Sequence, residues 1–192
     1  MTSGFDAIVL AGGHARRFGS DKLAAPAGGA TVLDLTLAAT HAAASVVCVG
    51  PRRTTTTDVR WTREDPPGDG PVPGIAAGLV EVDAPHVLLL GGDMPRAWSG
   101  VAALLAAASA SGTAGSAVAP GPWVAVGSDG RLQPLLALWP TEALRRRVAA
   151  VLGSSHRSVT ALYDDVEVQR VRVDDAAVRD VDTPHDLDDP GV

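Results

Sequence analysis

The sequence contains one cysteine, few aromatic residues and no long apolar run, and each shortage excludes a class of protein. The single Cys48 cannot build a disulfide framework, and its apolar surroundings, S-V-V-C-V-G, are typical of a buried small hydrophobe. A cytoplasmic location is therefore expected. No apolar stretch is long enough to span a membrane, and the N-terminus lacks the basic-then-apolar pattern of a signal peptide. The five histidines show no metal-ligand spacing.

Charge and composition narrow the class further. A formal net charge of −6 argues against a protein that coats nucleic acid, although a local cationic loop and a metal could still hold a phosphorylated small substrate. The chain has 192 residues, of which 46% are hydrophobic and 20% charged, and this predicts one soluble globular domain over residues 1–192. Aromatic residues make up only 4%, so we expect a core of Val, Leu and Ala.

Residues 6–22, D-A-I-V-L-A-G-G-H-A-R-R-F-G-S-D-K, carry the strongest pattern. A short apolar run predicts a buried strand, two glycines follow at once, and cationic side chains then accumulate. Backbone N–H groups of glycines and positive side chains together are typical of a phosphate-binding loop. The stretch contains neither G-K-[ST] nor G-x-G-x-x-G. A solvated basic loop after an ordinary strand would have the same composition.

The spacing L-A-G-G-x-x-x-R-x-G-x-x-K, from Leu10 to Lys22, resembles the nucleotide-binding motif of the NTP transferases related to molybdenum cofactor guanylyltransferase. The resemblance implies Mg²⁺-dependent transfer of GMP from GTP to the phosphate of molybdopterin, with release of pyrophosphate. It implies that Arg17 and Lys22 stabilise the triphosphate and the leaving group. It also implies nucleotide contacts from Leu10, Ala11, Gly12, Gly13 and Lys22.

A proline- and glycine-rich segment, E-D-P-P-G-x-G-P-x-x-G-I-A-A-G-L, resembles the loop that lies beside the base in the same family. By that resemblance Asp65 and Gly74 are candidate nucleotide contacts. The alternative for Asp65 is a turn-forming residue before Pro66.

Asp93 follows the most apolar predicted strand, residues 86–90, in the sequence G-G-D-M-P. In open parallel α/β sheets ligands bind beyond the carboxyl ends of the strands, where Gly12 and Gly13 also emerge. Mg²⁺ is typically held by one or two carboxylates and substrate phosphates. The resemblance likewise implies that Asp93 is a catalytic residue, a nucleotide contact and a metal ligand.

The tail A-V-R-D-V-D-T-P-H-D-L resembles the closing motif of the family, with Asp180 and Asp182 in place of its usual asparagines. Two interpretations of Asp182 stay open: a second metal ligand, or part of a cap on a short C-terminal helix. The segment Q-P-L-L-A-L-W resembles the part of the family that faces the acceptor, which makes Gln133 and Pro134 candidate acceptor contacts.

Strands alternate with helices from residue 6 to about residue 110, which predicts βαβ units and a mostly parallel sheet. Extended runs around Ser128-Asp129-Gly130 predict an antiparallel hairpin. We therefore expect a three-layer, Rossmann-like α/β nucleotidyltransferase fold, with a nucleotide-binding part over about 1–110 and an acceptor-binding part over about 111–192. Arg52 and Arg53 are interpreted as a solvated turn, with approach to an anionic ligand as the alternative. Arg145, Arg146 and Arg147 are interpreted as the solvated face of a helix.

In the family L-A-G-G accompanies guanine and L-A-A-G cytosine, so the resemblance favours GTP. One departure is Val49-Gly50-Pro51, where family guanylyltransferases often have asparagine. Two alternatives remain: an enzyme that uses CTP, or a sugar or lactyl phosphate, and a non-catalytic nucleotide-binding module. Retention of Arg17, Lys22 and Asp93 together favours an enzyme.

Overall fold

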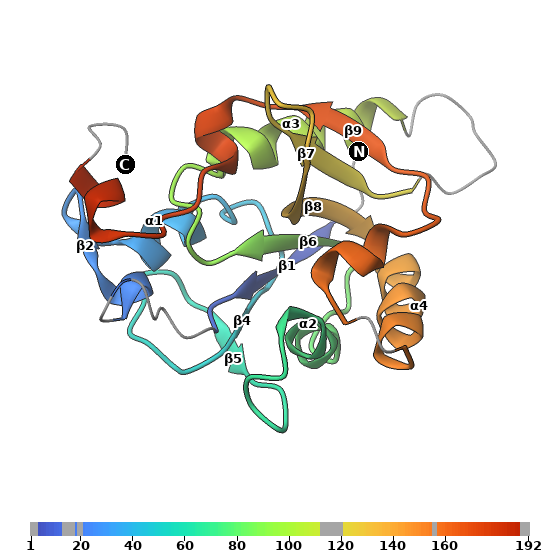
Figure 1. Cartoon of the computed structure of the whole chain (residues 1–192), viewed down its shortest axis with the longest axis horizontal. Coiled ribbons are helices and arrows are strands. Elements are labelled where there is room, and N and C mark those ends of the chain that lie inside the picture. The colour runs from blue at the N-terminus through green and yellow to red at the C-terminus, as the bar shows by residue number, and fades with distance from the viewer. Residues whose placement is uncertain (1–3, 13–17, 19–20, 112–120, 155–156, 189–192) are drawn as a thin grey trace.

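The computed structural model describes residues 4–12, 18, 21–111, 121–154 and 157–188 (Figure 1). Seven strands form one sheet in the order β5-β4-β1-β6-β8-β7-β9. They are β1 (Phe5–Leu10), β4 (Val46–Val49), β5 (Arg60–Thr62), β6 (His86–Gly91), β7 (Trp123–Val126), β8 (Leu132–Pro140) and β9 (Gln169–Arg172), and a separate small pair joins β2 (Pro26–Ala27) to β3 (Ala30–Thr31).

The strands β5, β4, β1 and β6 run parallel, and β9 runs parallel to β7. The predicted hairpin is present, and its strand β8 lies between β6 and β7, antiparallel to both. The expected α/β fold with a mostly parallel sheet and an antiparallel addition is confirmed. Strands from both halves of the chain share this one sheet, because β6 pairs with β8.

Alternating side chains of the strands divide the core into two layers. Ala7 and Val9 of β1 face a cluster that contains α1 (Val32–Ala38) and α3 (Trp98–Ser111). Ile8, between them, faces a cluster that contains α2 (Pro71–Leu79) and α4 (Thr141–Leu152). This is the period-two alternation of a strand buried on both faces. The helices accordingly lie on both sides of the sheet, which gives three layers (Figure 1).

Short 3-10 helices complete the described chain: η1 (Lys22–Ala24), η2 (Val159–Tyr163), η3 (Asp175–Val178) and η4 (Pro184–Asp188). Thr31 caps α1 by accepting the Asp34 N–H at 3.0 Å. Cys48 is fully buried in β4, in agreement with its interpretation as a small hydrophobe. In the part of the chain that the structure describes, every helix is too short or too polar to cross a membrane.

The arginines of α4 correct one sequence interpretation. Arg146 is exposed, as expected for a solvated face. Arg145 instead donates from Nη2 to the carbonyls of Leu79 and Val82, at 3.1 and 2.7 Å. Arg147 donates to the carbonyls of Ala161 and Leu162, at 2.8 and 3.0 Å. Both side chains reach along the surface to backbone carbonyls of neighbouring segments, which helix periodicity alone does not reveal.

The carboxyl ends of β1 and β6 lie next to each other and form the edge at which the predicted loops emerge. The Gly92 N–H donates to the Leu10 carbonyl at 3.0 Å. A Cβ on Gly92 would lie 2.8 Å from that carbonyl oxygen, so the two chains approach this closely only because the residue is glycine. The segments that contain Gly12 and Asp93 are therefore held side by side.

Candidate active site

Lys22 and Asp93 meet at this edge although they lie far apart in sequence. Lys22 begins η1, which is capped by the Asp21 carboxylate and anchored by the buried Leu23. Asp93 lies in the turn after β6. The Lys22 Nζ donates to Asp93 Oδ2 at 2.6 Å and to the Val181 carbonyl at 3.0 Å. The two side chains are 19% and 25% exposed, so the ion pair is partly shielded from water.

The C-terminal segment completes this cluster. The Val181 N–H donates to the Asp93 carbonyl at 2.9 Å, which fastens the tail to the turn after β6. Asp182 Oδ1 then lies 3.5 Å from Lys22 Nζ, with the Asp182 side chain 66% exposed. The sequence brings Asp93 and the Gly12-Gly13 turn to one edge by topology, whereas the family resemblance supplies the roles of Lys22 and Asp182.

The structure gives the capping role that was considered for Asp182 mainly to another residue. A short helix, η4, does follow Asp182, but the carboxylate that accepts the hydrogen bonds at its start belongs to Asp186. Asp186 Oδ2 accepts hydrogen bonds from the N–H groups of Asp182 and Thr183, at 2.9 and 2.7 Å, and from Thr183 Oγ1 at 3.0 Å. The Asp182 carboxylate faces Lys22 instead.

The charges around Lys22 perturb each other. Burial alone would lower the pKa of the Lys22 ammonium, but the hydrogen bonds and charges of Asp93 and Asp182 raise it above its ordinary value. The pKa of the Asp180 carboxyl is raised to about 7, first because the carboxyl is removed from water and then because the negative charges of Asp93 and Asp182 lie nearby. The residue as a whole still keeps solvent contact. The carboxylates of Asp93, Asp180 and Asp182 thus outnumber the Lys22 ammonium that lies beside them. This excess of negative charge favours the binding of a further cation.

Arg53 links the two ends of the glycine loop, and this overturns its interpretation as a solvated turn. Its Nη1 donates to the Ala11 carbonyl at 2.7 Å. Its Nε and Nη2 donate to the two carboxylate oxygens of Asp21, at 2.8 and 3.0 Å. Arg53 holds the pKa of the Asp21 carboxyl below its usual range through these hydrogen bonds. Ala11 and Asp21 flank the loop that carries Gly13 and Arg17, both of which lie outside the described residues.

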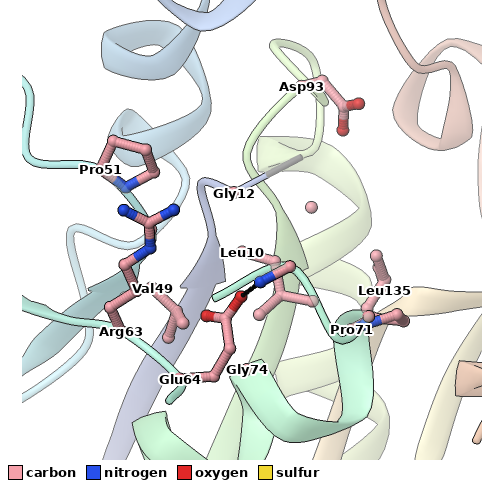
Figure 2. A pocket seen from close by; sticks show the side chains of 14 residues that line it. Leu10, Gly12, Val49, Pro51, Arg63, Glu64, Pro71, Gly74, Asp93 and Leu135 are labelled. Carbon is pink, nitrogen blue, oxygen red and sulfur yellow. Dashed lines mark hydrogen bonds between the residues drawn. The ribbon is translucent and has the colours of Figure 1, made fainter. Parts of the chain in front are cut away.

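A cavity of about 490 Å³ opens beside these groups (Figure 2), within the ~300–1,000 Å³ typical of small-molecule sites. Of the residues expected to contact a nucleotide, Leu10, Gly12, Gly74 and Asp93 line it. Ala11 is fully buried, and Asp65 is exposed and is not among the lining residues. The other lining residues fall almost entirely in segments that the sequence singled out: Val49, Gly50 and Pro51, Glu64, Gly68, Gly70 and Pro71, Gly91, and Leu135. Arg63 is the lining residue outside those segments.

The comparisons with known proteins identify the family. Residues 7–171 match the family model described as the MobA-like NTP transferase domain. The chain belongs to this family. Among its relatives, a probable molybdenum cofactor guanylyltransferase of Chloroflexus aggregans is 33% identical over 165 residues, which cover 81% of this chain and 76% of the relative. A probable molybdenum cofactor guanylyltransferase of Mycobacterium marinum is 30% identical over 192 residues, which cover 95% and 91%.

Solved structures show the same fold. Molybdopterin-guanine dinucleotide biosynthesis protein A from Archaeoglobus fulgidus aligns with a TM-score of 0.70 at 18% identity, covering 95% of each chain. The 2-C-methyl-D-erythritol 4-phosphate cytidylyltransferase from Thermus thermophilus aligns with a TM-score of 0.66 at 20% identity, covering 94% of each chain. At these identities the likeness concerns the fold, which both of these proteins share with the chain.

The donor groups of this MobA-like NTP transferase fit a magnesium ion that is held partly by substrate. Among the described residues, no group of three or more His, Cys, Asp or Glu side chains is arranged to hold a metal by itself. The carboxylates of Asp93 and Asp182 both approach the Lys22 ammonium, however, and so share one cation position. Mg²⁺ needs only one or two such carboxylates when phosphate oxygens complete its shell.

The candidate acceptor residues engage neighbouring backbone. Gln133 Nε2 donates to the Val178 carbonyl at 3.2 Å, and the Pro134 carbonyl accepts the Tyr163 hydroxyl at 2.7 Å. The next residue, Leu135, lines the cavity. The β8 segment therefore borders the cavity, and the acceptor role of Gln133 and Pro134 stays a prediction.

Proposed function

We propose that this MobA-like NTP transferase transfers GMP from GTP to the phosphate of molybdopterin and releases pyrophosphate. The observation that carries the proposal is the Lys22–Asp93 pair at 2.6 Å beside a cavity that Gly12 and Asp93 both line. This pair supports the proposal because a cation, a carboxylate and the glycine turn after β1 then lie beside a space large enough for a small-molecule substrate. The names of the C. aggregans and M. marinum relatives support the choice of nucleotide and acceptor.

The reaction joins an oxygen of the acceptor phosphate to the α-phosphorus of GTP and breaks the bond from that phosphorus to the oxygen bridging to the β-phosphate. The electron pair of that bond leaves with pyrophosphate. A phosphate monoester has a second pKa of about 6, so at neutral pH the acceptor is largely a dianion and needs no general base. Catalysis then consists of positioning and charge neutralisation.

Individual residues have separate tasks in this proposal. Lys22 exchanges its hydrogen bond to Asp93 for one to the triphosphate, and Gly12 and Gly13 offer backbone donors. Asp93 and Asp182 would hold Mg²⁺, which when bound neutralises charge on the phosphate oxygens. Arg17 is proposed to stabilise the pyrophosphate leaving group.

The test is a transfer assay with purified protein, Mg²⁺, molybdopterin and each of GTP, CTP, UTP and ATP, in which the dinucleotide product and pyrophosphate are both measured. We expect product with GTP in the presence of Mg²⁺ and none when the metal is chelated. Product formed with CTP and not with GTP would replace the proposal with cytidylyl transfer. Nucleotide binding without pyrophosphate from any pair would show a non-catalytic module.

A further inference from the structure

The strand β8 leaves the regular sheet at the point where it borders the cavity. Its pairing with β6 ends at Leu136. Its pairing with β7 is interrupted, because Ala125 alone lies between the paired residues of β7, whereas residues 133–136 lie between those of β8. Residues 133–135 therefore form a bulge, a device that re-aims side chains and is over-represented next to active sites. Leu135 lies in this bulge and lines the cavity (Figure 2).

A bulge leaves backbone groups without partners in the sheet, and side chains from other segments supply them here. Pro134 has no N–H, and its carbonyl accepts from the hydroxyl of Tyr163 at 2.7 Å. Next to it, Gln133 Nε2 donates to the Val178 carbonyl at 3.2 Å. These two hydrogen bonds fasten the bulge to segments that lie 29 and 45 positions away in the sequence.

Trp139 determines where the Tyr163 hydroxyl directs its proton. The indole Nε1–H of Trp139 donates to the Tyr163 oxygen at 3.2 Å, and the centres of the two rings lie 5.1 Å apart. An indole N–H can only donate, so the hydroxyl accepts from Trp139 and its own proton is left for the Pro134 carbonyl. Burial also raises the pKa of Tyr163, so the hydroxyl stays protonated and remains a donor well above neutral pH.

The position of Tyr163 is itself fixed by the core and by α4. Trp139 is fully buried and Tyr163 nearly so, in the core cluster that contains α2 and α4. Tyr163 ends η2, and Arg147 of α4 donates to the carbonyls of Ala161 and Leu162 in that helix. The hydroxyl is therefore a rigid support for an irregular stretch of β8.

The strand order β1-β6-β8 places the bulge on one side of Asp93 and the glycine turn on the other. Asp93 follows β6, Gly12 follows β1, and Leu135 comes from β8. In phosphoryl transfer the attacking and leaving oxygens are roughly in line through the phosphorus, so they lie on opposite sides of it. If the glycine turn and Lys22 receive the triphosphate, as the proposed function requires, the acceptor reaches the α-phosphorus from the side of β8.

We propose that Tyr163 is a positioning residue for the acceptor, because its hydroxyl holds the bulge of β8 in place at the cavity. This inference rests on the proposed function, which assigns the β8 side of the cavity to the acceptor. Tyr163 is not among the residues that line the cavity, so it acts through the bulge and touches neither substrate. Its loss should therefore change how the acceptor is held and leave the nucleotide on the β1 side undisturbed.

Tyr163→Phe tests this inference, because phenylalanine keeps the ring against Trp139 and removes only the hydroxyl. We expect the KM for molybdopterin to rise by about fivefold to tenfold, the factor that corresponds to one neutral hydrogen bond. The affinity for GTP, measured by calorimetric titration with Mg²⁺ and without acceptor, should stay that of the wild type. A variant that was merely less folded would instead lose kcat and keep both KM values.

Thr141→Val is the matched control. Thr141 is buried, and its Oγ1 donates to the Ala84 carbonyl at 2.7 Å, a hydroxyl-to-carbonyl hydrogen bond of the same length just beyond the far end of β8. Its loss should lower the melting temperature as Tyr163→Phe does. It should leave the KM for molybdopterin unchanged, because the bulge keeps both of its ties.

Hydrogen exchange followed by mass spectrometry tests the same contact without any substrate. A peptide that contains the amides of Gln133 and Leu135 should exchange faster in Tyr163→Phe than in the wild type, because exchange reports local opening of the backbone. In Thr141→Val the same peptide should exchange as in the wild type.

The inference is wrong if Tyr163→Phe keeps the wild-type KM for molybdopterin, or if Thr141→Val raises that KM as much. It is also wrong if exchange at the bulge is the same in Tyr163→Phe and the wild type. Failure of the proposed function gives a different pattern. A wild-type protein that forms no pyrophosphate from GTP and molybdopterin contradicts the reaction and the acceptor role together, whereas a normal wild-type reaction with an unchanged KM in Tyr163→Phe overturns the role of Tyr163 alone.

Discussion

The Lys22 ammonium lies 2.6 Å from the Asp93 carboxylate across 71 positions of sequence. The parallel pairing of β1 and β6 brings the two carboxyl ends together, and η1 then returns Lys22 to the edge. A lysine in contact with a candidate metal-binding carboxylate suits a site that alternates between two cation arrangements. In the proposed function the ammonium neutralises Asp93 when no nucleotide is bound and turns toward phosphate when one is.

We predict that Lys22→Ala and Asp93→Ala each abolish measurable turnover while the protein remains folded. Removal of one group that stabilises charge in a transition state typically lowers kcat by about 10²–10³-fold. Pyrophosphate release measures the loss, and circular dichroism with thermal unfolding checks the fold. Full activity in either variant would contradict the assignment of this site.

A separate prediction concerns magnesium. In the wild type the Lys22 ammonium lies 2.6 Å from the Asp93 carboxylate and 3.5 Å from the Asp182 carboxylate, and Lys22→Met removes it. A divalent cation should then bind more tightly without nucleotide, because it no longer competes with a lysine. We expect Mg²⁺ to raise the melting temperature of Lys22→Met more than that of the wild type. Lys22→Met combined with Asp93→Asn should lose this response, and an equal shift in all three proteins would show that the ion binds elsewhere.

Arg53 should control the geometry of the glycine loop. It spans the Ala11 carbonyl and both oxygens of Asp21, a fork that the single ammonium of lysine cannot reproduce. We predict that Arg53→Lys weakens binding of nucleoside triphosphate by on the order of tenfold, as for loss of one hydrogen bond to a charged group. Arg52→Lys, a change at an exposed neighbour, is the control and should bind as the wild type does.

A double-mutant cycle identifies the partner of Arg53. Asp21→Asn alone should also weaken binding of nucleoside triphosphate. Arg53→Lys and Asp21→Asn together should reduce the binding free energy by less than the sum of the two single effects, because both disrupt the same ion pair. If the two effects on the binding free energy are strictly additive, the Arg53 guanidinium acts through the Ala11 carbonyl or through the ligand, and its contact with Asp21 plays no part in binding.

The sequence predicts those parts of the molecule that depend on local pattern. Apolar runs indicate β1 and β6, and the rule that ligands bind at the carboxyl ends of parallel strands brings Gly12 and Asp93 to one edge. These features follow from backbone hydrogen bonding and burial, which a single segment largely determines by itself.

Arg53 and Glu64 show what the sequence does not reveal. Each lies in a polar loop, where a charged side chain usually points into water, and nothing local distinguishes them from Arg52 or Asp65. The direction of Arg53 depends on groups that the tertiary fold brings near, the Ala11 carbonyl and the Asp21 carboxylate, and one segment of sequence does not contain such contacts. Glu64 accepts the N–H of Gly68 in its own loop, and the backbone path of that proline- and glycine-rich loop does not follow from a periodic pattern.

Two glycines of α2 provide a matched pair of substitutions. A Cβ on Gly74 would meet Val49 Cγ1 at 3.4 Å and Leu10 Cδ2 at 3.6 Å, contacts that those side chains can accommodate. Helix propensity favours alanine over glycine by about 1 kcal/mol. We predict that Gly74→Ala leaves the free energy of unfolding unchanged or raises it, yet weakens GTP binding because the methyl group enters the cavity. Urea unfolding and GTP titration measure the two effects.

Gly78→Ala should do the reverse. A Cβ on Gly78 would lie 2.9 Å from Ile8 Cγ2 and 3.1 Å from Val49 Cγ2, at the face of α2 that touches the sheet. Overpacking of this kind costs about 1–3 kcal/mol, more than the gain in helix propensity. We expect a lower free energy of unfolding with a smaller effect on GTP affinity. Equal behaviour of the two variants would contradict the assignment of Gly74 to the cavity wall.

His86 should make stability depend on pH. It begins β6, its ring lies 6.0 Å from that of Trp123, and its Nδ1 is buried without a hydrogen-bond partner among the described residues. Burial holds the pKa of His86 below its ordinary value of about 6.5. In the unfolded chain the imidazole therefore takes up a proton at a higher pH than in the folded protein. The folded state loses stability as pH falls below about 6.5, and the loss continues until the lower folded pKa is passed.

Comparison with His86→Phe isolates this contribution from the other titrating groups, because phenylalanine keeps the ring contact with Trp123 and cannot be protonated. We predict that the free energy of unfolding of the wild type, measured in urea, falls relative to that of His86→Phe between pH 7.5 and pH 5. The exposed His41 offers the control, and His41→Phe should follow the wild type over this range. A constant difference between wild type and His86→Phe would mean that His86 gains a partner for its charge on protonation, and the acid sensitivity of the fold would then lie in its carboxylates.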